Sequence, residues 1–292
     1  MTRCKLFILS FGLMCSLTLS AQLHRVGVGV SVGAHTMFAD TALNKLWGPT
    51  VGIEGYYACL FPIGNSGLWM GPRTGLEAAW LQGGWETPVS NRFSSTDYLN
   101  HSINYTVKGS VRETHNDISL AVPVMVALKY KGIMAGLGVK ARGVVWSSAK
   151  TNISELNTSA YYPDFDVIVT NEPKLGAIVD AEQEIKDSRT MPEWHVAVAA
   201  EIGYEFEVVK YQFLGLRLFA TYDVWNSYKL EDSLPRIYDI QAPDAATMAV
   251  SPVLNPLYKT ALTQFNTFTI GVTISYIFEI YRESHHCNCL PY

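Results

Sequence analysis

The most constraining feature of this chain is an unbroken alternation of side-chain type from Thr267 to Phe278. One face of this segment is small or polar except at Ile277, and the opposite face is entirely large and apolar: Phe268, Ile270, Val272, Ile274, Tyr276 and Phe278. A period of two residues indicates a β-strand, and a tilted strand needs about 9–11 residues to cross a bilayer. Strand edges cannot be left unpaired in lipid. The pattern therefore predicts one strand of a closed transmembrane barrel.

Seven further segments show the same alternation, and the connections between the eight segments differ regularly in length. Those after the second, fourth and sixth segments are short, whereas residues 86–116, 147–193 and 226–264 form long ones. Short periplasmic turns and long external loops are typical of outer-membrane barrels. The sequence predicts an all-β fold, an eight-stranded antiparallel up-and-down transmembrane β-barrel with long extracellular loops and both termini periplasmic. The predicted strands are Val26–Phe38, Thr50–Leu60, Leu68–Gln82, Ile118–Tyr130, Ile133–Trp146, His195–Phe206, Tyr211–Trp225 and Thr267–Phe278.

The N-terminal segment and the composition support this assignment. Arg3 and Lys5 precede an apolar stretch, and the small residues Ser20 and Ala21 follow it, so residues 1–21 are predicted to be a signal peptide. We expect the barrel domain at residues 22–281 and a periplasmic tail, outside the fold, at 282–292. Charged residues are only 16% of the chain, against about 25% in soluble domains. A net charge of -4 gives no basic surface for nucleic acid.

Aromatic residues gather at both ends of the predicted strands, as expected for rings at the level of lipid headgroups. The outer belt is predicted to contain Trp47, Trp80, Trp85, Trp146, Trp194 and Trp225, and the inner belt Tyr57, Phe61, Tyr130, Phe206, Tyr211, Phe213 and Tyr281.

Pro123 interrupts the fourth strand, and a bulge is predicted there because proline cannot donate a ladder hydrogen bond.

Charged side chains of both signs fall on the inward face of the strands. An eight-stranded barrel is just wide enough for its side chains to fill, and buried charges must be paired. The favoured interpretation is a structural salt-bridge plug, with Glu54 bound to Arg73 and Glu201 bound to Arg142 or Arg217. The alternative is a narrow path for ions or small solutes. The inward charges are Glu54, Arg73, Glu77, Lys129, Lys140, Arg142, Glu201, Glu205, Arg217 and Asp223.

Other chemistry has weak support. The tail carries His285, His286, Cys287 and Cys289, which are soft metal ligands, but their spacing is a poor match to a structural zinc site. The acidic segment 180–187 is predicted to form a short helix. No nucleophile elbow, phosphate-binding loop or zinc-protease motif is present. We therefore predict neither a catalytic activity nor a cofactor.

Three strands also carry a family likeness. The run from Ile118 to Tyr130, with its Pro123 and its final Lys-Tyr, resembles a strand of the PorT-like outer-membrane β-barrel family of Bacteroidota. The glycine-rich segment Ala135–Val139 and the strand Leu216–Tyr222 are similar to later strands of that family. The resemblance implies an eight-stranded barrel. It does not imply a single activity, because the family is functionally mixed and has no shared catalytic residues.

Three functional hypotheses follow. The favoured one is a monomeric barrel in outer-membrane lipid, with a structural role or a surface partner bound by its long external loops. The resemblance adds a second, an accessory component of a protein secretion system that contacts the secretion machinery. The third is a soluble secreted β-barrel that binds a ligand.

Overall fold

The computed structural model describes residues 22–39, 43–96, 99–170, 183–189, 193–227, 237–241, 251–260 and 265–281. The predicted signal peptide and the tail with His285, His286, Cys287 and Cys289 lie outside the described residues.

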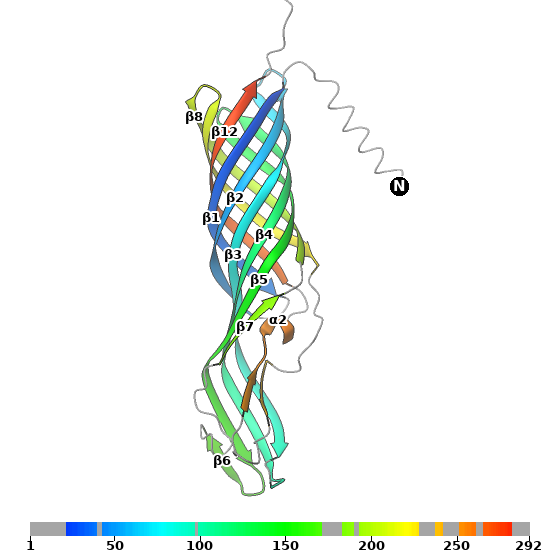
Figure 1. Cartoon of the computed structure of the whole chain (residues 1–292), viewed down its shortest axis with the longest axis vertical. Helices are drawn as coiled ribbons and strands as arrows, with labels where there is room; N and C mark the ends of the chain where they lie inside the picture. Colours follow the sequence, from blue (N-terminus) through cyan, green and yellow to red (C-terminus); the bar gives the residue numbers. More distant parts are fainter. Residues whose placement is uncertain are drawn as a thin grey trace, which may run out of the picture.

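Eight antiparallel strands form a closed ring (Figure 1), which confirms the predicted fold class. Each strand pairs with its neighbours in chain order, and β12 pairs with β1 from Tyr281↔Leu23 to Phe265↔Ala39, so the barrel has no open edge. In ring order the strands are β1 (Leu23–Ala39), β2 (Asn44–Ile63), β3 (Leu68–Thr96), β4 (Ser102–Tyr130), β5 (Ile133–Tyr162), β8 (Glu193–Val209), β9 (Gln212–Asn226) and β12 (Phe265–Tyr281).

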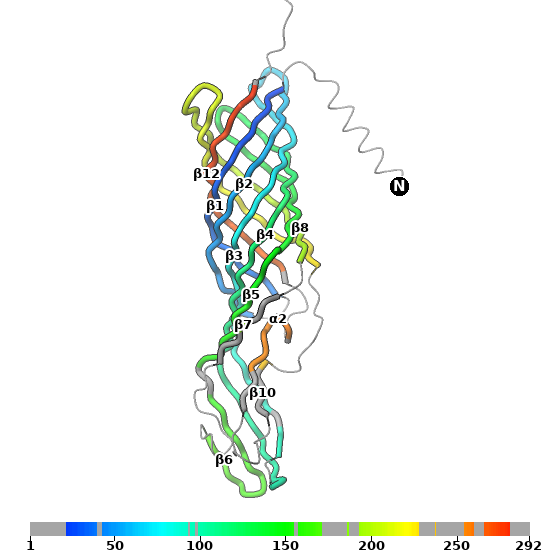
Figure 2. Tube along the Cα trace, viewed as in Figure 1, coloured from blue at the N-terminus to red at the C-terminus, as the bar shows by residue number. Residues whose placement is uncertain are grey.

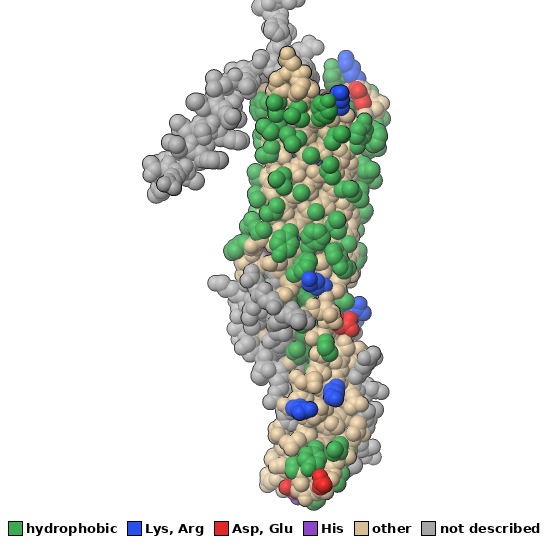
Figure 3. Space-filling view, turned by 180° about the vertical axis from the view of Figure 1, so that it is seen from behind, with side chains coloured by type: hydrophobic (Ala, Val, Ile, Leu, Met, Phe, Trp, Pro, Cys, Tyr) green, Lys and Arg blue, Asp and Glu red, His purple; other side chains and the backbone are tan. Residues whose placement is uncertain are grey.

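The two faces of the barrel wall have opposite character. Outward side chains are large, apolar and exposed: Val28 is 57% exposed and Leu76 is 71% exposed. Figure 3 shows apolar side chains spread over the face of the barrel that is seen in that view. Inward polar side chains are buried, including Arg25, Arg73 and Arg217. Such an inverted distribution is favourable only when the apolar outer face contacts lipid.

Three strands are much longer than predicted. Most of the predicted loop 86–116 is a hairpin, because β3 runs on to Thr96 and β4 begins at Ser102. β5 continues to Tyr162, and together the three strands form a sheet that protrudes from one end of the barrel (Figure 2). We call this the distal end, and the end with the short turns the proximal end. β6 (Val167–Thr170) and β7 (Gln183–Arg189) both pair with β5. The predicted helix at 180–187 is therefore wrong at 183–187, because cross-strand pairing overrides local propensity there.

The described parts of the connection between β9 and β12 lie at the distal end of the barrel (Figure 1). The connection contributes β10 (Tyr238–Gln241), β11 (Ser251–Leu254) and the one-turn helix α2 (Leu257–Thr260). No helix among the described residues is long and apolar enough to span a bilayer. The connection packs on the inner face of the protruding sheet in a distal core of Met37, Trp85, Val89, Ile103, Tyr105, Val107, Val111, Ala149, Ile153, Ala160, Leu254, Leu257 and Tyr258.

Two predicted belt residues lie elsewhere. Trp85 is fully buried in the distal core, and Phe213 faces the lumen beside Arg25 and Lys129. Both have the inward parity of their strands, and this outweighs their position near a strand end. The side chain of Tyr281 is outside the described set, whereas Trp47, Trp146, Trp194 and Trp225 are exposed.

The structure also corrects the prediction at Pro123. Its pairing with Lys140 continues the register of its neighbours without a shift, so there is no bulge at Pro123. The carbonyl of Pro123 instead accepts a hydrogen bond from Thr74 Oγ1 at 2.9 Å. By contrast, Lys131 and Gly132 form the predicted tight turn, and both have positive φ (47° and 87°). Positive φ at both central residues is the geometry that hairpin twist favours.

Candidate functional site

The lumen is filled by layers of paired charges. Nearest the proximal end, Arg25 binds Glu205 at 2.5 Å and Glu279 at 3.1 Å. Lys129 contacts the same two carboxylates, and its ammonium lies 4.6 Å from the centre of the Phe213 ring. Arg25 and Glu279 were missed in the sequence. Each lies one alternation step beyond the inward residues Gly27 and Ile277, so strand parity could have identified both.

The middle layer is a closed ring of two arginines and two glutamates. Arg73 contacts Glu54, with Nη2 to Oε2 at 3.6 Å, and also donates to Glu201. Arg217 donates to Glu201 Oε2 at 3.0 Å and to Glu54. The Tyr56 ring lies 4.0 Å from the Arg73 guanidinium and 5.1 Å from that of Arg217. The predicted pairs Glu54–Arg73 and Glu201–Arg217 are therefore present, together with two contacts that cross the barrel.

Two further pairs lie toward the distal end. Lys140 Nζ donates to Glu77 Oε2 at 2.5 Å. Arg142 donates to Asp223 Oδ2 at 2.7 Å, so its acid partner is Asp223 and not Glu201. His195, which the sequence analysis did not single out as a charge partner, lies 2.9 Å from the same Asp223 oxygen through Nδ1. Thr267 Oγ1 also donates to that oxygen, at 2.7 Å.

The space left between these layers is small. One cavity of about 30 Å³ lies beside Lys140 and Arg142, and another of about 20 Å³ lies beside Arg73 and Glu201. A cavity of this size holds about one water molecule. Neither of these two cavities is large enough for an organic ligand.

At the distal end of the barrel, a buried carboxylate binds residues 251–260, which we call the lid. Glu113 is fully buried and accepts hydrogen bonds from the backbone N–H groups of Leu257 at 2.6 Å and Tyr258 at 3.1 Å. Thr151 Oγ1 donates to it at 2.7 Å, and His115 Nε2 lies 2.8 Å away. A carboxylate that binds the first N–H groups of a helix satisfies donors that have no partner within the helix. Glu113 thus joins the lid to the barrel wall.

The chemistry of this interior is that of ion pairing. Each inward carboxylate named above lies against a basic side chain or backbone donors. Among the described residues, no group of three His, Cys, Asp or Glu side chains is arranged to hold a metal ion. The predicted charge residues are thus brought together as a stack of pairs and not as a pocket.

Comparisons with known proteins add little to this geometry. No family model matches the chain, and no curated protein is similar to it. The solved structures that match include Ail, the attachment invasion locus protein of Yersinia pestis, in complex with the heparin analogue sucrose octasulfate. That match has 10% identity and a TM-score of 0.29, and it covers 89% of this chain and 100% of that one.

The CymD monoaromatic hydrocarbon channel matches with 5% identity and a TM-score of 0.18, covering 91% of this chain and 90% of that one. The toluene transporter TodX of P. putida matches with 6% identity and a TM-score of 0.15, covering 91% of each chain. Because these likenesses are so weak, the fold assignment rests on the strand pairing itself.

Proposed function

We propose that this chain is an integral outer-membrane protein whose closed barrel anchors a protruding sheet that binds a protein partner at the cell surface. The observation that carries this proposal is the combination of a sealed lumen with an exposed apolar sheet tip. The apolar outer band supports residence in a membrane. Long connections at one end support an extracellular distal end and periplasmic termini.

The filled lumen argues for an anchor and against a narrow pore. An ion crossing the barrel would have to break the Arg25, Arg217 and Lys140 pairs in turn and then pass the lid held by Glu113. Breaking a buried pair costs about 3–5 kcal/mol. We therefore expect no steady conductance in planar bilayers, and a stable open channel would favour the pore hypothesis.

The tip of the sheet presents apolar side chains far from the lipid-facing band. Leu99 is 58% exposed, Phe165 is 57% exposed and Ile168 is 69% exposed. A group of exposed apolar residues on a surface outside the membrane marks an interaction site.

The test is in-cell photocrosslinking from a photoreactive amino acid placed at Ile168. We expect a discrete crosslinked partner on intact cells, and its loss when Phe165→Asp is combined with the probe. Ser102→Asp, an exposed polar position on the same sheet, is the matched control and should leave the crosslink unchanged. A probe that crosslinks nothing, or equal crosslinking in both variants, would contradict a partner site at the tip.

The PorT-like resemblance supports a second candidate, an accessory role in protein secretion. Deletion of the gene should then abolish release of secreted cargo, and normal release would remove this candidate. Carbonate extraction addresses the soluble alternative, because a protein released without detergent cannot be an integral barrel.

A further inference from the structure

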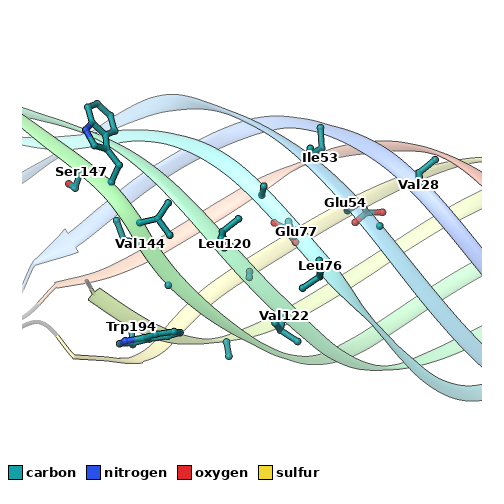
Figure 4. Close-up of a pocket in the computed structure, with 17 residues that line it drawn as sticks. Val28, Ile53, Glu54, Leu76, Glu77, Leu120, Val122, Val144, Ser147 and Trp194 are labelled. Carbon is teal, nitrogen blue, oxygen red and sulfur yellow. The ribbon is translucent and has the colours of Figure 1, made fainter. Parts of the chain in front are cut away.

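The lipid-facing wall contains one large apolar groove. It has a volume of about 960 Å³ and crosses the outer surface of the barrel from β1 to β8 (Figure 4). Its floor is formed where outward positions are occupied by the small residues Gly55, Ala78, Ala141 and Gly143. Larger outward side chains form its walls: Val28, Ile53, Leu76, Leu120, Val122, Val145, Trp146 and Trp194. Residues of inward parity complete the lining: Glu54, Glu77, Ala121, Val144 and Ser147.

The strand register shows how the groove runs. Gly55 lies opposite Val28 on β1 and Leu76 on β3, and Gly143 lies opposite Leu120 on β4 and Trp194 on β8. Five strand spacings of about 4.8 Å separate β1 from β8, which gives a length of about 24 Å. Val28 lies deep in the membrane-spanning part of β1, whereas Trp194 lies at the distal end of β8. The groove is therefore oblique and opens at the distal belt.

A bulge shapes the distal end of the groove. Ile118 pairs with Trp146 and the next residue, Ser119, pairs with Val144, so Val145 is an extra residue in β5. As a result, two consecutive side chains point outward, with Val145 60% exposed and Trp146 49% exposed. Bulges of this kind redirect side chains and are frequent beside functional sites. Here the bulge places two large apolar side chains in succession on the outer face.

Basic residues lie on the same outward face just beyond this end. Lys150 is four residues past Trp146 on β5, and β7 places Lys186 directly opposite it. Arg112 is exposed on β4, opposite Asn152. The acid Glu86 shares the face, since it is opposite Arg112, and the backbone of Glu184 pairs with that of Asn152. Lysine and arginine are the side chains that bind phosphate groups.

We propose that the groove binds the acyl chains of a phosphorylated glycolipid of the outer leaflet, with its phosphate at Arg112, Lys150 and Lys186. Hydrocarbon is the occupant because the groove lies within the lipid-facing band and all of its outward lining residues are apolar. The outer leaflet follows from the distal opening, and the basic residues select a phosphorylated headgroup. This inference uses the membrane orientation of the proposed function but not its protein partner.

The experiment is native mass spectrometry of the purified full-length protein in mild detergent, titrated with lipid A or with phosphatidylethanolamine. Ala141→Leu combined with Gly55→Leu fills the groove floor; an added Cβ at Gly55 meets no atom within 4 Å. Ala200→Leu on β8 is the matched control, because it is also outward and exposed but lies outside the groove. Heat-modifiable gel migration verifies that each variant is folded.

We expect lipid A to bind the wild-type protein at least about tenfold more tightly than phosphatidylethanolamine. The groove variant should lose about tenfold in lipid A affinity, equivalent to about 1.4 kcal/mol, and Ala200→Leu should lose none. Lys150→Ala should weaken lipid A binding, whereas Lys210→Ala at the proximal turn should not. Equal binding of both lipids, or an equal effect of the groove variant and its control, would overturn the proposal. Neither result would depend on whether the sheet tip binds a partner.

Discussion

Removing the Arg217 guanidinium should destabilise the barrel without opening it. Arg217 is 1% exposed and binds both Glu54 and Glu201, so the substitution Arg217→Met leaves two buried carboxylates sharing Arg73 alone. Leaving a buried charge without its partner costs about 3–5 kcal/mol. We expect the free energy of unfolding to fall by that amount, and conductance in planar bilayers to stay at background because the layers on both sides are intact.

A second substitution separates charge imbalance from lost packing. In the double variant Arg217→Met with Glu54→Gln, the remaining Arg73–Glu201 pair is neutral. Its free energy of unfolding should therefore exceed that of the single variant by about 2 kcal/mol, a coupling typical of residues in one network.

Urea unfolding in liposomes, followed by tryptophan fluorescence and by gel migration, measures these free energies. The exposed Lys210→Met is the control and should change stability by less than about 0.5 kcal/mol. A cost below about 1 kcal/mol for Arg217→Met would mean that the ring behaves like an exposed surface pair. A large conductance in a normally folded Arg217→Met barrel would refute the plug directly.

Three other predictions follow from single contacts. Glu113→Gln should lower the free energy of opening the lid by about 1.5–3 kcal/mol, the range for hydrogen bonds to a charged group. Amide hydrogen exchange at residues 251–260 should then become faster, whereas exchange in the barrel strands should not change. Gly71→Ala should prevent barrel assembly, since an added Cβ would lie 1.9 Å from the Cys59 carbonyl oxygen, whereas Gly55→Ala should fold normally in the same heat-modifiability assay. The hydrogen bond from Tyr161 Oη to Asp166 raises the pKa of the tyrosine. The contact therefore stabilises the folded protein below the unfolded tyrosine pKa near 10, and this stabilisation is lost as the pH rises through the folded pKa. Ultraviolet titration of Asp166→Asn should show a lower pKa for Tyr161, and an unchanged pKa would contradict this contact.

Strand parity explains how much of this fold could be predicted. Period-two alternation locates the membrane-spanning part of all eight strands, and it also assigns inward positions to residues that the sequence analysis placed elsewhere or passed over. Trp85 has the parity of Arg73 and Glu77, and Phe213 has that of Arg217. Position near a strand end suggested a belt for both, but the pleat decides which face a side chain occupies.

Contacts across the lumen could not be predicted in the same way. Arg73 on β3 binds Glu201 on β8, and these strands are not neighbours in the ring. Which inward residues meet across a barrel depends on the stagger of the strands, and parity alone does not specify it. The lid was also beyond prediction, because the contact between Glu113 and the backbone of Leu257 joins a strand to an irregular connection that has no periodic pattern.

The proximal layer, the middle ring and the two pairs beside it are each electrically balanced. Two bases and two acids form the proximal layer, two arginines and two glutamates form the middle ring, and Lys140 and Arg142 each have one acid partner. This balance keeps each of these charges within reach of an opposite charge, which a buried ion pair requires if it is to offset its desolvation. A conducting pore needs the opposite arrangement, with charges of one sign facing a continuous aqueous path. The neutrality of these layers is therefore a physical reason to assign binding to the outer surfaces, where the groove and the sheet tip lie.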